Sequence, residues 1–318
     1  YFFVKLDLPM SNGQIQNFID LVKSRIYPKE NQAGFKKHTI LESHDFYGFT
    51  NFTKFKFIRF EFFNMAAYKS LERVFKKKII IPGVSKKAIK FKIYESNIIP
   101  FIRMAHIKQL NLVGWIELES GKYHKTETNY ADSLTELNIS CSWKNLKPYN
   151  EIKSVKFIIC SFDLECTSID GSFPNPTRPG DKIIQIGLTL SRYGEDECYA
   201  KYILTLGGCT KLEGIDVRCY DTEEELLLAF SRLIVELDPD IITGYNIFGF
   251  DFKYLEERSK KLGCHTSFSK LGRIKNEASP FVDKTLASSA LGKNELKYYA
   301  LQGRVQVDIM KVAQRDYR

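Results

Sequence analysis

The chain contains 318 residues with a formal net charge of +9, and 44% of the residues are hydrophobic. This length suggests two domains, and no uncharged apolar run approaches the length of a transmembrane helix, so we expect no membrane association. The seven cysteines form no CxxC pair, which favours reduced thiols over a disulfide framework or a zinc cluster.

The charge is unevenly distributed along the chain. Residues 1–150 contain 24 Lys and Arg against 13 Asp and Glu, whereas the remainder contains 23 against 25. A basic first half beside a mildly acidic second half suits a polyanion-binding surface next to a carboxylate site. Lysines that only keep the surface soluble are an equally good explanation on charge alone.

The first hundred residues have the order strand, helix, strand, strand, helix, strand. Apolar spacing predicts helices over 12–26 and 64–78, the second with Asn64 as N-cap, and strands over 2–8, 38–49, 54–63 and 88–95. This order is typical of a ferredoxin-like βαββαβ unit, which RNA-recognition modules share.

Two features of this region suggest nucleic-acid contact. The strand over 54–63 carries four phenylalanines that could stack bases, but we favour a core role for them: Phe55, Phe57, Phe60 and Phe62. The lysine run between Lys76 and Lys92, which includes Lys77 and Lys78, is the better candidate for phosphate contacts, with a solvated surface as the alternative.

Residues 101–147 look rich in β-structure, and "LKPYNE" (146–151) suggests a domain boundary near residue 150. Beyond it, three apolar strands over 154–166, 182–190 and 199–206 precede a helix over 221–237, with Asp221 as N-cap and Glu224 completing a capping box. A strand over 241–246 and a helix over 251–262, closed by Gly263, follow. This order predicts an α/β ribonuclease-H-like domain with a mixed sheet, its fourth strand parallel to the first.

Three carboxylates are expected to converge in that domain. Asp163 and Glu165, two residues apart on the first strand, point to one face, and Asp251 follows the adjacent parallel strand. Either motif alone would more often be structural, but together they favour a hard cation, Mg²⁺ or Mn²⁺. Two such ions roughly 4 Å apart would suit phosphodiester hydrolysis.

These stretches resemble family B DNA polymerases. "SFDLECTSIDGSFPNPTRPGDKIIQIG" (161–187) is similar to the first exonuclease motif of the family, and "GYNIFGFDFKYL" (244–255) to the second. The segments over 93–118 and 288–310 resemble the eukaryotic delta class, and "YGFTNFTKFKFIRFEF" (47–62) resembles polymerases of large DNA viruses.

The resemblance implies 3′→5′ proofreading. Asp163 would ligate both metals, Glu165 one metal and the terminal 3′ hydroxyl, and Asp251 the second metal. Asn246 and Phe250 match positions that contact the frayed strand, and Phe173 lies in a loop expected near the substrate. The acid in "VQVDIM" (305–310) is expected to be structural.

The resemblance also sets the expected organisation and partners. Residues 1–150 would be the amino-terminal polymerase domain and residues 151–318 the exonuclease domain. DNA, the remaining polymerase domains and a processivity factor are the implied partners, in the nucleus or at a cytoplasmic viral replication site.

We expect the third exonuclease motif of the family, Y-x-x-x-D, to lie beyond the end of this sequence. We also expect an initiator Met before its start. We therefore expect an excised piece with weak or no nuclease activity. The alternative is a non-catalytic nucleic-acid-binding or assembly module with an incomplete nuclease site. A free exoribonuclease is disfavoured by the delta-like flanking segments.

Overall fold

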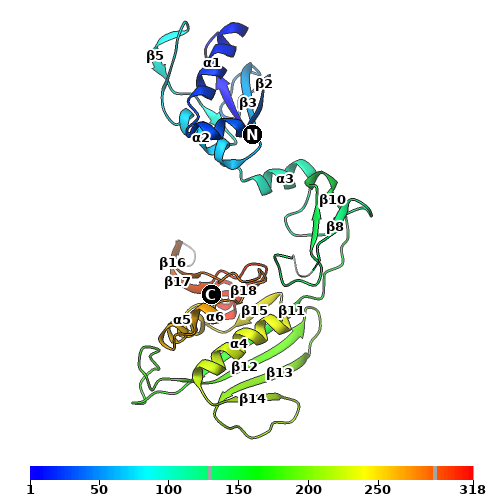
Figure 1. Ribbon diagram of the computed structural model, residues 1–318, viewed down its shortest axis with the longest axis vertical. Helices are drawn as coiled ribbons and strands as arrows, with labels where there is room; N and C mark the ends of the chain where they lie inside the picture. Colours follow the sequence, from blue (N-terminus) through cyan, green and yellow to red (C-terminus); the bar gives the residue numbers. More distant parts are fainter. Residues whose placement is uncertain (128–130, 289–291, 318) are drawn as a thin grey trace. The chain divides into compact units, whose positions relative to one another are not determined.

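The computed structural model describes residues 1–127, 131–288 and 292–317 (Figure 1). The chain divides into two compact units, Tyr1–Ile116 and Glu117–Arg318. The division therefore falls before the boundary near residue 150 that the sequence suggested. Backbone bonds explain why the intervening segment belongs with the second unit, because residues 132–134 pair with residues 273–275 in an antiparallel bridge.

The amino-terminal unit is built on a four-stranded sheet with the order β2-β3-β1-β6 and antiparallel pairing throughout. Its elements in chain order are β1 (Phe2–Leu6), α1 (Asn12–Ser24), η1 (Lys29–Gly34), β2 (Phe35–His44), β3 (Lys54–Phe62), α2 (Met65–Phe75), β4 (Ile79–Ile81), β5 (Ser85–Ile89), β6 (Ile93–Tyr94) and α3 (Pro100–Lys108).

Helix α1 buries the residues that its apolar spacing indicated, namely Ile15, Phe18, Ile19 and Val22. The Asn64 side chain accepts a hydrogen bond from the Ala67 amide, which confirms the predicted N-cap of α2. These apolar helix faces form one core with the sheet residues that point toward them, Phe2, Val4, Ile58 and Phe60 among them.

The phenylalanines of β3 divide between the two sheet faces. Phe60 is fully buried in the core, and Phe57 is buried on the opposite face. The Lys5 ammonium lies 3.7 Å from the ring centroid of Phe55 and covers one side of this aromatic ring. The burial of these rings agrees with a core role rather than with base stacking.

Two parts of this unit differ from the sequence-based prediction. The single strand expected over 88–95 is divided between β5, which forms a hairpin with β4, and the two-residue β6. The region after residue 100, expected to be β-rich, begins with helix α3, which has Pro100 at its first position. Proline suits that position because the first helical amides have no partner within the helix.

The second unit contains a six-stranded mixed sheet with the order β14-β13-β12-β11-β15-β18. Its elements are β7 (Ile116–Glu117), which begins one residue before the division, β8 (Tyr123–Lys125), β9 (Ile139–Cys141), η3 (Trp143–Asn145), β10 (Lys147–Pro148), β11 (Ile158–Cys166), β12 (Ile183–Arg192), β13 (Cys198–Leu206), β14 (Asp216–Tyr220), α4 (Glu223–Leu237), β15 (Ile241–Gly244), α5 (Asp251–Lys261), α6 (His265–Phe268), β16 (Phe281–Ser288), β17 (Gly292–Tyr299), β18 (Val305–Asp308) and α7 (Ile309–Asp316).

The pairing within this sheet matches the predicted topology. Strands β11, β12 and β13 pair antiparallel in succession, and β15 lies beside β11 and parallel to it. Helices α4 and α5 contribute Leu227, Phe230 and Phe252 to a core with the buried face of the sheet. Strands β14 and β18 and the β16–β17 hairpin were not predicted.

The start of α4 differs by one residue from the prediction. Thr222, not Asp221, is the N-cap, because its hydroxyl accepts a hydrogen bond from the Glu225 amide while the Glu225 carboxylate accepts from the Thr222 amide. Both candidate pairs satisfy the spacing of a capping box, and the extended backbone at Thr222 decides between them.

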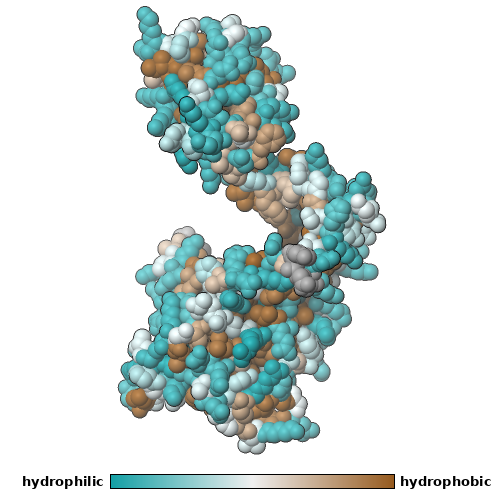
Figure 2. Space-filling model, viewed as in Figure 1, coloured by the Kyte–Doolittle hydropathy of each residue, from teal (hydrophilic) through white to brown (hydrophobic). Residues whose placement is uncertain are grey.

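Hydrophilic residues cover most of the face of each unit seen in Figure 2, with hydrophobic residues in separate patches. None of the helices in the described ranges has both the length and the apolar character that a membrane crossing requires.

Candidate functional site

Strand β11 places two carboxylates on one face. Cys160, Phe162 and Leu164 are buried, whereas Asp163 and Glu165 are exposed, as the period-two alternation of a strand requires. The residue opposite Asp163 on β12 is Gly187, and an added Cβ there would meet nothing within 4 Å. The surface beside Asp163 is therefore open to a ligand.

The end of β15 is held close to β11. A Cβ added at Gly244 would lie 2.5 Å from the backbone oxygen of Phe162, so only glycine allows this approach. After it the chain turns through Asn246, whose φ of 61° is left-handed. This turn brings the chain to Asp251 at the start of α5.

Asp308 fixes the same turn from the neighbouring strand. It is almost fully buried, and its carboxylate accepts hydrogen bonds from the amides of Asn246 at 2.9 Å, Phe248 at 3.1 Å and Met310 at 3.0 Å. These bonds agree with the predicted structural role of this acid.

Replacing Asp308 with Ala is expected to lower the free energy of unfolding by about 2–3 kcal/mol, because buried amides lose a charged acceptor. Asp308→Asn, which keeps one oxygen acceptor, should cost less. Urea unfolding of both variants checks the order, and equal stability of Asp308→Ala and the parent chain would contradict it.

Asp251 is a buried acid whose pKa is raised. Its side chain is 2% exposed, and its Oδ1 atom is buried without a hydrogen-bond partner. Burial, and then the negative charge of Asp163, raise the pKa of Asp251 to about 7, while backbone amides including that of Leu164 oppose this shift. The charge of Asp163 therefore acts on the buried carboxyl group of Asp251.

The carboxylate oxygens of Asp163, Glu165 and Asp251 are suitable ligands for a divalent cation. The site offers carboxylates as donors, which hard cations such as Mg²⁺ and Mn²⁺ prefer, and Asp251 has a buried oxygen that lacks a partner. Within the described ranges, however, no group of three or more His, Cys, Asp or Glu side chains is arranged to hold a metal ion. The charge of Asp163 acts on Asp251, and a ligand triad with Glu165 is not shown.

Two aromatic side chains meet beside these acids. Phe173, in the loop between β11 and β12, is 76% exposed, and its ring centroid lies 5.2 Å from that of Phe250 at an interplanar angle of 70°. Asn246 is half-buried, and its side-chain oxygen lies 2.2 Å from where a Cβ of Gly249 would be. The three residues predicted to contact a strand therefore lie on two loops that flank Asp251.

Comparison with known proteins decides the family. The family described as DNA polymerase family B, exonuclease domain, matches residues 91–318. The chain belongs to DNA polymerase family B. It is 31% identical to a DNA polymerase of Acanthamoeba polyphaga mimivirus over 397 aligned residues, covering 100% of this chain and 23% of that protein. It is also 38% identical to the DNA polymerase delta catalytic subunit of Oryza sativa subsp. japonica over 255 residues, covering 78% of this chain and 22% of the rice protein.

The fold has a counterpart among solved structures. The family B DNA polymerase of the hyperthermophilic archaeon Pyrobaculum calidifontis aligns over 97% of this chain with a TM-score of 0.52 and 19% identity, covering 31% of the archaeal chain. This likeness shows the fold alone. The family B chain described here spans about a quarter of the length of these two curated relatives.

A buried ion pair that the sequence did not reveal holds the loop of Phe173. Arg258 on α5 is 1% exposed, and its Nε donates to Glu223 at 2.7 Å. The Nη1 atom of Arg258 donates to the carbonyl oxygens of Pro176 at 3.1 Å and Arg178 at 2.9 Å. No local pattern marks this pair, because its members lie on different helices, 35 residues apart.

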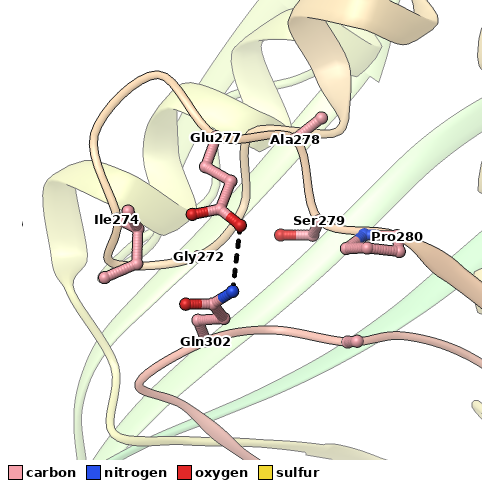
Figure 3. Close-up of a pocket in the computed structure, with 8 residues that line it drawn as sticks. Gly272, Ile274, Glu277, Ala278, Ser279, Pro280 and Gln302 are labelled. Atoms are coloured by element: carbon pink, nitrogen blue, oxygen red, sulfur yellow. Dashed lines mark hydrogen bonds between the residues drawn. The ribbon is translucent and has the colours of Figure 1, made fainter. Parts of the chain in front are cut away.

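The small cavity drawn in Figure 3 is not a candidate ligand site. Its volume is about 10 Å³, and its lining includes Gly272, Ser279 and the hydrogen-bonded pair Gln302 and Glu277. Such a space holds about one water molecule. None of the predicted site residues lines it.

The remaining predicted residues lie in the amino-terminal unit. Lys76, Lys77 and Lys78 directly follow α2, are exposed, and line an open pocket together with Arg25 and Arg73. This pocket shares no residue with the acids of β11 and α5.

Proposed function

We propose that the second unit is a 3′→5′ exonuclease that proofreads DNA from a single-stranded or frayed 3′ end. The observation that carries this proposal is the buried Asp251 oxygen without a partner, beside the charge of Asp163, in a family B exonuclease domain. Residues 1–150 and 151–318 remain our proposed functional division of the chain.

In this proposal Asp163, Glu165 and Asp251 hold two divalent ions, Mg²⁺ or Mn²⁺, which supply an activated water and stabilise the leaving oxygen. Gly187 leaves the space beside Asp163 open for the scissile phosphate. The Asn246 amide group hydrogen-bonds the terminal nucleotide, and the rings of Phe250 and Phe173 stack against unpaired bases.

The topology supports two fold assignments that we propose with this function. The mixed sheet, with β15 parallel to β11 after a helical crossover, supports a ribonuclease-H-like exonuclease domain. The antiparallel order β2-β3-β1-β6 supports a ferredoxin-like unit at the amino terminus, with the β4–β5 hairpin as an addition.

The similarity to delta catalytic subunits and a mimivirus polymerase supports a replicative context. We propose DNA as the substrate and the polymerase domains of the same chain as partners. A processivity factor is a further proposed partner. The corresponding location is the nucleus, or a cytoplasmic replication site if the chain is viral.

Replacing Asp163 with Asn is expected to reduce shortening of a 5′-labelled single-stranded oligonucleotide by at least about a hundredfold, because misplacing a reacting group by about 1 Å has a comparable effect. Protein in excess over DNA, with Mg²⁺ or Mn²⁺, makes slow cleavage measurable. Products resolved on a sequencing gel show whether nucleotides leave from the 3′ end.

The matched control is Asp196→Asn, which removes one exposed acid from the turn between β12 and β13. It should cleave like the parent chain. Equal cleavage by Asp163→Asn and the control would place any activity outside this site. Absence of cleavage by the parent chain, with unchanged Mn²⁺ affinity in Asp163→Asn, would instead favour the non-catalytic binding module.

A further inference from the structure

An open basic pocket lies on the helical side of the amino-terminal unit. It has a volume of about 490 Å³ and is lined by eight residues from two segments of the chain: Arg25, Tyr27, Ser70, Arg73, Val74, Lys76, Lys77 and Lys78. Five of these residues are cationic and none is acidic. We call this feature the α2 groove.

Hydrogen bonds hold the backbone that forms the α2 groove. Asn31 donates a 2.9 Å hydrogen bond to the hydroxyl of Ser70, which is buried on α2. The Lys90 ammonium donates to the carbonyl oxygens of Phe75 and Lys76, the last residue of α2 and its C-cap. These bonds fix the segment before and the turn after the helix, so the cationic side chains project from a defined backbone.

The charge of the groove is largely uncompensated. Within the described residues, Lys76 forms an ion pair with Glu72 at 3.2 Å, and the other four lining cations form none. The whole unit, residues 1–116, contains 20 Lys and Arg against 8 Asp and Glu. Cations gathered in a concave surface concentrate the field and attract a polyanion.

Tyr27 adds an aromatic surface to this charge. Tyr27 is 79% exposed and lines the groove, so its ring is accessible to a ligand. A cationic groove with an exposed ring is the combination that binds single strands, because phosphates follow the cations and a base stacks on the ring. A duplex keeps its bases stacked and offers none to Tyr27.

We propose that the α2 groove is a binding site for single-stranded nucleic acid. The sugar-phosphate backbone follows Arg73 and the lysines from Lys76 to Lys78, and one base stacks on Tyr27. The site is independent of the exonuclease proposal, since it shares no residue with the acids of β11 and α5.

The test measures binding of a fluorescein-labelled oligothymidylate of about 16 nucleotides, a length within the usual range for one single-strand site. The whole 318-residue chain is used, with EDTA to prevent cleavage. In Lys77→Ala/Lys78→Ala, the slope of log K against log salt should decrease in magnitude by about 1.4, roughly 0.7 for each lost phosphate contact.

Lys86→Ala/Lys87→Ala is the matched control. It removes the same charge from the same lysine run, but its exposed positions on β5 do not line the groove. Its slope should change by less than half as much. Equal changes of slope in the two double variants would show that the effect depends only on net charge, and would overturn the proposal.

Stacking is tested at Tyr27. Tyr27→Ala should weaken binding at least about fivefold, and Tyr27→Phe should restore most of it, because the ring and not the hydroxyl provides the contact. An unchanged affinity in Tyr27→Ala would overturn the proposal, as would equal affinity for a duplex of the same length. Asp196→Asn, which changes an exposed acid outside both proposed sites, should bind as the parent chain does.

Discussion

Arg258→Met is expected to lower the free energy of unfolding of the second unit by about 3–5 kcal/mol, the usual effect of breaking a buried ion pair. Glu223 is 6% exposed and would remain as a buried carboxylate without its cation. The carbonyl oxygens of Pro176 and Arg178 would also lose their donor. Urea unfolding followed by circular dichroism measures the change.

The same substitution should release the loop that carries Phe173. Limited proteolysis is therefore expected to cut within residues 167–182 of Arg258→Met and to spare this loop in the parent chain. Other bonds to the loop remain, among them the one from the Tyr254 hydroxyl to the Asp181 carbonyl oxygen at 3.0 Å and the one from the Lys261 ammonium to the Thr177 carbonyl oxygen at 2.6 Å, so we expect a loosened loop in an otherwise folded unit.

A second substitution identifies the source of the loss. In the double variant Arg258→Met/Glu223→Gln the buried charge is gone, and the amide oxygen can still accept the hydrogen bond that Ile183 donates to Glu223. It should be more stable than Arg258→Met alone. Arg232→Met, an exposed arginine on α4, is the control and should change stability by no more than about 0.5 kcal/mol. A similarly small change in Arg258→Met would contradict the prediction.

Asp251→Asn is expected to stabilise the fold at pH 8 and to have little effect at pH 4. The folded pKa of Asp251, about 7, lies above its ordinary value of 3.8. The protonated carboxyl is therefore favoured in the fold, and its contribution to stability is lost as pH rises through 7. Above that pH the parent chain carries a buried charge that costs about 2–4 kcal/mol, and the variant does not.

Thermal unfolding at several pH values, without divalent ions, checks this dependence. The melting temperatures of the two chains should diverge between pH 4 and pH 7 and then stay apart. Added Mn²⁺ should raise the melting temperature of the parent chain at pH 8 more than that of Asp251→Asn, because the ion binds only the folded state. Parallel pH profiles would show that the pKa of Asp251 is not raised.

The control for this experiment is again Asp196→Asn, whose exposed carboxylate should give the pH profile of the parent chain. The comparison also bears on the metal site. If the variant gains stability at pH 8 but Mn²⁺ affects both chains equally, the buried acid would be confirmed and the assignment of Asp251 as a ligand would fail.

The sequence by itself determined the local pattern of both units. The alternation along 160–165 was sufficient to place Asp163 and Glu165 on the exposed face of β11, because strand geometry depends only on neighbouring residues. The spacing of Ile15, Phe18 and Val22 was sufficient for α1 for the same reason. The parallel pairing of β15 with β11 also followed from the order of elements.

Only the tertiary structure decided which distant groups meet. Glu223 and Arg258 lie on separate helices, and Arg25 joins the lysines after α2 across the unit. The partnerless oxygen of Asp251 likewise results from burial between elements. Such contacts depend on packing and desolvation over long sequence separations, and no periodicity in the chain records them.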